Sequence, residues 1–204
     1  MDFDLWRFHA GFVVSVPQVY RSYHRSPAVG ERSGYCPACG AACRLERAAG
    51  RTRPVCTGCG RVRYRNPLPG VAVVIREAGR VLLARRRGAW GVPAGFVEYD
   101  EDYLSAAHRE VREETGLEIE LTGLANPSSN FVRPDLHSLV GVVCARRIGG
   151  TLRPGDDVDA LRWAPLRGAH GGVGFEGDRL ALQALAEERL PVLPIDSRFR
   201  RSRP

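Results

Sequence analysis

Three glutamates at helical spacing are the most chemically suggestive group in this sequence. Glu110, Glu113 and Glu114 stand at positions i, i+3 and i+4 within residues 103–115, whose apolar residues recur on one side of a helix. On that helix the three carboxylates share an arc of about 100° beside the buried face. Clustered carboxylates suit Mg²⁺ or Mn²⁺, which prefers oxygen ligands and shares them with substrate phosphates. The alternative is a solvated acidic face balanced by neighbouring arginines.

A second group consists of cysteines. Two CxxCG pairs, Cys36 with Cys39 and Cys56 with Cys59, are separated by 16 residues. This spacing is typical of a structural zinc site with four thiolate ligands, and a segment this small needs a metal to be stable. Cys43 is close enough in sequence to compete as a ligand.

The elements around these groups follow from periodicity and turn residues. Strands are expected at 71–75, 81–85, 119–124, 136–146 and 160–166, and a late helix at 178–189. A helix over 103–115 should end at Gly116, which favours the left-handed conformation of a C-cap. NPLPG at 66–70 marks a domain boundary, because its prolines exclude helix and interrupt strands.

The glutamates belong to a longer pattern. Gly95 is followed after five residues by Glu101 and, seven residues later, by the run REVREETGL that starts at Arg109. This pattern resembles the Nudix box at every fixed position. The resemblance implies an α/β fold, the α/β/α sandwich of Nudix domains around a mixed sheet, preceded here by a small four-cysteine zinc ribbon.

The resemblance also implies roles for individual residues. It implies a hydrolase that uses Mg²⁺ or Mn²⁺ to cleave a diphosphate linkage by attack of water on phosphorus. The implied metal ligands are Glu110, Glu113, Glu114 and the backbone carbonyl of Gly95. Arg109 and Glu101 are implied to support the site and complete the catalytic set.

The general base and the phosphate-binding residues are less determined. Glu110 is the first candidate for the base, and the aspartates of PGDDVD, which otherwise form a turn, are the second: Asp156, Asp157 and Asp159. Arginines at the end of the strand before the glycine-rich loop can grip phosphate. Among these we predict substrate binding by Arg85 and Arg87.

The layout of a zinc ribbon before a Nudix domain, joined by RYRNP, resembles NADH pyrophosphatases and related enzymes. Their SQPWPFPxS signature is missing, however, and NPSSNFVRPDLHS stands in its place. PAGFVE and Pro134 favour ADP-ribose or a similar ADP-sugar or dinucleotide as substrate. NADH or NAD-capped RNA remains an alternative.

Composition limits the other possibilities. The chain has 204 residues, a net charge of +7 and thirty basic residues, all of them arginine. No apolar run approaches the ~18 residues of a membrane span, and the acidic start MDFDLW is unlike a signal peptide, so we expect a cytoplasmic protein with no membrane partner. The arginine excess also permits a different class of function, a nucleic-acid-binding or ligand-sensing regulator with a non-catalytic Nudix fold. The intact box disfavours this alternative.

The expected organisation therefore has four parts: an extension at 1–33, a zinc ribbon at 34–66, a Nudix domain at 67–190 and a basic tail at 191–204. The expected partner is a small nucleotide substrate, with a homodimer possible and nucleic acid not favoured.

Overall fold

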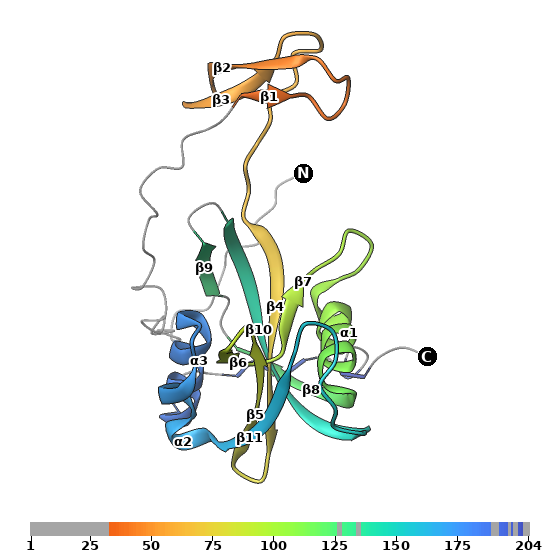
Figure 1. The fold of residues 1–204 in the computed structure, drawn as a ribbon, viewed down its shortest axis with the longest axis vertical. Helices are drawn as coiled ribbons and strands as arrows, with labels where there is room; N and C mark the ends of the chain where they lie inside the picture. Colours follow the sequence, from red (N-terminus) through yellow and green to blue (C-terminus); the bar gives the residue numbers. More distant parts are fainter. Residues whose placement is uncertain are drawn as a thin grey trace, which may run out of the picture.

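The computed structural model describes residues 33–125, 128–133, 136–188, 192–195, 197 and 200–201 (Figure 1). Apart from Ser33, the expected N-terminal extension lies outside these residues, as do Pro134 and half of the expected basic tail. Among the described residues, no helix has the length and apolar character needed to cross a membrane.

The N-terminal cysteine segment, 34–66, folds as a small antiparallel sheet, here called the ribbon (Figure 1). Its strands are β1 (Gly34–Tyr35), β2 (Ala42–Ala48) and β3 (Arg51–Cys56), in the order β1-β2-β3. The turn between β2 and β3 has positive φ at Ala49 (47°) and Gly50 (75°). Two consecutive left-handed residues give the tight connection that matches the twist of the two strands.

The second sheet is mixed. Five strands run in the order β11-β5-β4-β10-β8. Three further strands pair with them: β6 with β5, β7 with β4 and β9 with β10. β4 and β10 are parallel, whereas the other described pairs are antiparallel. The strand bounds are β4 (Leu68–Glu77), β5 (Arg80–Arg86), β6 (Ala89–Gly91), β7 (Ala94–Phe96), β8 (Leu117–Leu124), β9 (Ser128–Arg133), β10 (Leu136–Gly150) and β11 (Ala160–Pro165).

Helices cover both faces of this sheet, as Figure 1 shows. Val71, Val73 and Ile75 of β4 pack with α1 (Tyr103–Thr115), and the alternate residues Ala72 and Val74 pack with α2 (Leu166–Ala169) and α3 (Glu176–Ala186). A 3₁₀ turn, η2 (His170–Gly172), joins α2 to α3. Because side chains alternate across a strand, a continuous apolar run buries both faces. The expected sandwich around a mixed sheet is confirmed.

The helix α1 has the bounds that the sequence predicts. Asp102 caps its start by accepting hydrogen bonds from the backbone N–H groups of Leu104 and Ser105. Gly116 ends it with φ = 67°, and its N–H donates to the carbonyl of Arg112. Both caps satisfy backbone groups that the helix leaves unpaired, so local chemistry fixes which residues are helical.

Other bounds differ from the expectation. The late helix spans Glu176–Ala186 rather than 178–189, and β10 continues to Gly150 rather than ending at 146. The short strands β6 and β7 lie in the glycine-rich stretch, which has no alternating pattern to reveal them. They form because β5 and β4 supply hydrogen-bonding edges, a contribution from distant parts of the chain.

Asp178 ties α3 to this region. Its carboxylate accepts a hydrogen bond from the Val92 N–H at 3.1 Å, and a Cβ on Gly91 would lie 2.7 Å from its Oδ2. Burial raises the pKa of Asp178 to about 6. The raised pKa means that the fold favours the protonated form of Asp178. Protonated Asp178 therefore stabilises the folded state at low pH, and this stabilisation is lost as pH rises from about 4 through about 6.

We therefore expect Asp178→Asn to remove this pH dependence while an amide oxygen still accepts from Val92. Urea unfolding at pH 4.5 and pH 7.5 measures the effect. Relative to the variant, the wild-type free energy of unfolding should fall at the higher pH. Parallel profiles for the two proteins would contradict the assignment.

Candidate active site and zinc site

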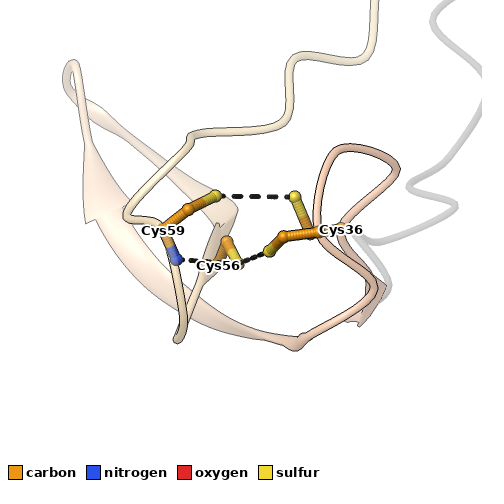
Figure 2. A group of neighbouring side chains, drawn as sticks. Cys36, Cys56 and Cys59 are labelled. Atoms are coloured by element: carbon orange, nitrogen blue, oxygen red, sulfur yellow. Dashed lines mark hydrogen bonds between the residues drawn. The ribbon is translucent and has the colours of Figure 1, made fainter.

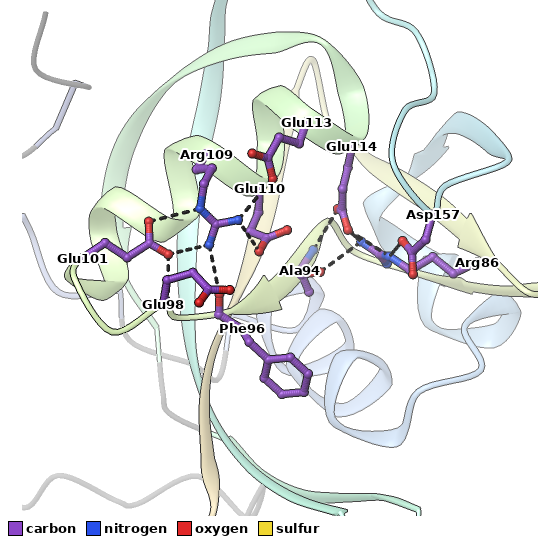
Figure 3. A network of polar contacts seen from close by, with 10 residues as sticks. All are labelled: Arg86, Ala94, Phe96, Glu98, Glu101, Arg109, Glu110, Glu113, Glu114 and Asp157. Atoms are coloured by element: carbon purple, nitrogen blue, oxygen red, sulfur yellow. Dashed lines mark hydrogen bonds and ion pairs between the residues drawn. The ribbon is translucent and has the colours of Figure 1, made fainter.

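Arg109 is the centre of the polar network on α1 (Figure 3). Two of its guanidinium nitrogens donate to the carboxylate of Glu101, Nε at 3.1 Å, and Nη2 also donates to the Phe96 carbonyl at 3.0 Å. Arg109 thus joins the helix to the loop before it and to β7. The residue predicted to support the site therefore lies where these three segments meet.

The remaining guanidinium nitrogen of Arg109 joins two of the glutamates. Nη1 donates to Glu110 Oε1 at 2.7 Å and to Glu113 Oε2 at 3.1 Å, so those oxygens lie within about 6 Å of each other. Glu110 is buried and burial raises its pKa, whereas Glu113 is 48% exposed. The positive Arg109 group between them offsets the repulsion of the two carboxylates.

Gly95 lies directly against Glu110. A Cβ built on Gly95 would be 2.0 Å from the Glu110 carboxyl carbon, a separation that no side chain can occupy. The register places Gly95 opposite Val71, so β4 holds the glycine beneath α1. The structure therefore brings together two of the predicted metal-site residues and explains why the strand needs a glycine here.

Glu114 has a different environment (Figure 3). It is 1% exposed, and its Oε1 accepts from Arg86 Nε at 2.9 Å and from Nη2, while its Oε2 accepts from the Ala94 N–H at 3.1 Å. Burial raises the pKa of Glu114 to about 7 against the opposing effect of Arg86. Glu114 thus faces β5 and β7, whereas Glu110 and Glu113 share Arg109.

Arg86 belongs to the run of three arginines, 85–87, considered for phosphate binding, but the predicted substrate-binding residues were its neighbours Arg85 and Arg87. Leu82 points to the α1 side of β5, so alternation places Arg86, four residues later, on that side, facing Glu114. Arg85 instead pairs with Asp159 and stacks at 5.7 Å on Trp90, and Arg87 is exposed in the next turn with φ = 49°. The alternation of apolar residues along the strand was the signal that could have identified Arg86.

The aspartate loop lies at the end of α1. The Gly155 N–H donates to the Glu114 carbonyl at 3.1 Å, and Asp157 accepts from Arg86 Nε at 3.1 Å. Asp156 has φ = 50°, consistent with the expected turn. Of the three aspartates, Asp157 thus shares the partner Arg86 with Glu114. Glu110, Glu113 and Glu114 are called the box glutamates below.

The four predicted cysteines converge at one end of the ribbon, and Figure 2 labels three of them. All four Sγ atoms lie within 4.8 Å of one another, and among the described residues this is the one group of potential ligand atoms so close together. The Cys36–Cys59 and Cys39–Cys56 sulfur separations are 3.8 and 3.5 Å. A tetrahedral site with Zn–S bonds of ~2.3 Å has sulfur atoms about 3.8 Å apart, so the quartet fits zinc.

The backbone turn around Cys56 favours the thiolate form of this cysteine. The N–H groups of Cys59 and Gly58 donate to its Sγ at 3.4 and 3.3 Å and lower the pKa of the thiol to about 6. Cys43 is buried opposite Cys56 in the β2–β3 ladder but stands outside the quartet. The expected ligand set is therefore the one that the geometry favours.

Zinc content tests this set. We expect about one zinc per chain, loss of that zinc in Cys56→Ala, and retention in Cys43→Ala, because only the first removes a ligand. Metal analysis of the purified proteins measures it, and limited proteolysis should show faster cleavage near residues 40–60 in Cys56→Ala. An equal loss in both variants would mean that Cys43 belongs to the site.

Comparisons with known proteins match the part of the chain that contains the box glutamates. A family model described as the NUDIX domain matches residues 66–182. A MutT-like protein of Streptomyces ambofaciens is 36% identical over 48% of this chain and 64% of its own length. An ADP-ribose pyrophosphatase of Methanocaldococcus jannaschii is 35% identical over 50% and 64%, and the NAD-capped RNA hydrolase NudC of Photobacterium profundum is 29% identical over 55% and 49%. The matches thus span less than two thirds of each curated relative.

Among solved structures, a Nudix hydrolase of Nitrosomonas europaea resembles this fold. Its crystal structure superposes with a TM-score of 0.67 at 26% identity, covering 76% of this chain and 92% of that one. The family model covers more than half of the sequence and includes Gly95, Glu101, Arg109 and the three box glutamates. The chain belongs to the Nudix family.

Proposed function

We propose that this protein is a divalent-metal-dependent Nudix pyrophosphohydrolase that cleaves the diphosphate linkage of a nucleoside diphosphate derivative. ADP-ribose, or a similar ADP-sugar or dinucleotide, is the proposed substrate. The observation that carries the proposal is the contact of Glu110 with Gly95. It places the carboxylates of Glu110 and Glu113 close to a strand backbone that has no side chain of its own at this position. The pyrophosphatase name of the archaeal relative supports the reaction class.

The residues present fit Mg²⁺ or Mn²⁺, since they offer carboxylate oxygens that already accept from a guanidinium. Glu110, Glu113, Glu114 and the Gly95 carbonyl would hold the ion. When bound, such an ion neutralises charge on the diphosphate oxygens and makes a nearby water more acidic. Arg109 then keeps the carboxylates oriented through Glu101 and the Phe96 carbonyl.

Within this site, Glu110 is the proposed general base. Burial raises its pKa, so its carboxylate accepts a proton more readily than an exposed glutamate does. Asp157 is the second candidate, because it reaches the site through Arg86, whereas Asp159 is engaged by Arg85. Asp157→Asn decides between them, because it removes no proposed metal ligand: a large loss of kcat would assign the base to Asp157, whereas an unchanged kcat would support Glu110.

For the second moiety of the substrate, Phe96 offers an exposed surface. Its side chain is 43% exposed directly after Gly95, which suits contact with a base or sugar. NAD-capped RNA is a second candidate substrate, favoured by the relatives named NudC.

Product identification tests the proposal. The protein is incubated with Mg²⁺ and ADP-ribose, NADH, diadenosine polyphosphates or nucleoside triphosphates, and products are separated by chromatography. We expect AMP and ribose 5-phosphate from ADP-ribose, and loss of that product in Glu113→Gln, whose carboxylate is half exposed and dispensable for packing. Glu118→Gln, an exposed glutamate just beyond α1, is the matched control and should remain active. No turnover of any substrate by folded, zinc-containing protein would argue for the regulator alternative.

A further inference from the structure

The ribbon carries a strong excess of positive charge. Seven of its residues are arginine and Glu46 is its single acidic residue, whereas the rest of the chain is close to neutral. A zinc ion with four thiolates contributes two negative charges, so the ribbon stays positive when loaded. An excess of guanidinium groups in a small module favours a ligand with several phosphates.

The strand register sorts these side chains onto two faces. Tyr35 lies opposite Ala42, Arg44 opposite Val55, and Arg51 opposite Ala48, and positions of the same parity on β2 point to one side. Val62 pairs with Val55 on the far edge of β3, which brings Tyr64 beside Arg53 on that side. The resulting arginine–tyrosine face consists of Tyr35, Arg44, Arg51, Arg53 and Tyr64. It also holds Glu46, which lies opposite Arg53 and pairs with Arg44.

This face is open to solvent. Tyr35 is 75% exposed at one edge, Tyr64 is 56% exposed at the other, and the Arg44 side chain between them is 72% exposed. The Arg53 guanidinium lies 5.0 Å from the centre of the Tyr64 ring, which holds that ring in a fixed position. The face is therefore a row of two aromatic rings with three arginines and one glutamate, Glu46, between them, and its net charge is positive.

The fold of the ribbon does not need these tyrosines. Its buried cluster consists of Cys36, Cys43 and Cys56 with Ala41 packed against it. Cys43 and Cys56 have the opposite parity in the ladder, so the zinc end and the arginine–tyrosine face use different sides of the sheet. Exposed rings that serve no packing role are available to stack on another group.

We propose that the arginine–tyrosine face binds single-stranded nucleic acid, with the arginines on phosphates and the two tyrosines stacked on bases. This inference rests on the proposed function, since the bound strand would be a substrate of the hydrolytic site. The ribbon leads through residues 60–67 into β4, whose Gly70 pairs with Phe96 next to the box. Four residues separate Arg65 from Gly70, a span of roughly 17 Å when the chain is extended. A strand bound on the ribbon could thus present its 5′ end to the hydrolytic site.

Fluorescence anisotropy with a 5′-labelled 12-nucleotide oligouridylate tests the face on the full, zinc-loaded chain at 50–200 mM salt. Arg44→Ala/Arg51→Ala removes two charges from the proposed face. Arg47→Ala/Arg61→Ala removes the same charge from the opposite side, because Arg47 faces Thr52 and Arg61 pairs with Cys56. We expect about tenfold weaker binding for the first pair only, with a salt slope reduced by about 1.4. Equal loss in both pairs would overturn the proposal in favour of diffuse charge.

Stacking needs its own comparison. Tyr35→Ala should weaken oligouridylate binding about tenfold and leave binding of inorganic polyphosphate unchanged, whereas Tyr35→Phe should behave like the wild type. Absence of any RNA binding, or equal RNA affinity of Tyr35→Ala and wild type, would overturn it. ADP-ribose hydrolysis is measured on the same proteins and should stay unchanged in the ribbon variants, so failure of RNA binding and failure of hydrolysis are distinguished.

Discussion

Gly95→Ala is expected to lower kcat for the proposed hydrolysis by at least about 100-fold while the protein stays folded. The added methyl group would stand 2.0 Å from the Glu110 carboxyl carbon, so either Glu110 or β7 must move. Displacement of about an ångström in a catalytic group costs on the order of 100-fold in rate. Steady-state kinetics with ADP-ribose and Mg²⁺ measures the loss, and circular dichroism reports whether the fold is retained.

The matched control is Gly171→Ala in η2. A Cβ on Gly171 meets no atom within 4 Å, and its φ is not in the left-handed region, so activity should be unchanged. If Gly95→Ala keeps full activity, the contact between Glu110 and the glycine backbone has no catalytic importance. Partial recovery by adding Glu110→Asp, which shortens the crowded side chain, would support the steric explanation.

Arg86→Ala is expected to destabilise the fold by about 3 kcal/mol, because it leaves the Glu114 carboxylate buried without its cation. The Arg86 side chain is 12% exposed and that of Glu114 is 2% exposed, so water cannot replace the lost partner without opening the structure. Arg86 also donates to the carbonyls of Val92 and Ala94, which hold the turn between β6 and β7. Chemical denaturation at pH 8, where Glu114 is ionised, measures the change.

A double-mutant cycle identifies the cause. Arg86→Ala combined with Glu114→Gln should be more stable than Arg86→Ala alone, since the second change removes the unpaired charge. Arg87→Ala, on the exposed neighbour, should change stability by less than about 0.5 kcal/mol. Additive effects of Arg86→Ala and Glu114→Gln would contradict the buried pair.

Two arginines thus divide the acidic residues between them. Arg109 engages Glu101, Glu110 and Glu113 on the more open side, and Arg86 engages Glu114 within the fold. The first set has an exposed member that a cation can reach, whereas the second set also holds α1 against the sheet. Because Glu114 is a proposed metal ligand as well, Arg86 variants should change both stability and metal dependence, whereas Arg109 variants should act mainly on metal dependence.

Local chemistry in the chain specified the helix and both candidate ligand sets. Asp102 and Gly116 supply the caps of α1, and the i, i+3, i+4 spacing places three glutamates along it. The CxxCG pairs likewise make their own knuckles, because each turn is formed by neighbouring residues. Such features depend on contacts close in sequence, so the sequence alone was sufficient to predict them.

Strand register and distant contacts decided the rest. Which arginine of the run 85–87 meets Glu114 depends on how β5 faces α1, and which ribbon residues share a face depends on the β1–β2–β3 pairing. The strands β6 and β7 exist because β5 and β4 pair with them, and Asp178 reaches Val92 across 86 residues of sequence. A shift of one residue in register would exchange the two faces of each strand. Only the folded chain therefore brings Arg86 to Glu114 and Gly95 beneath Glu110.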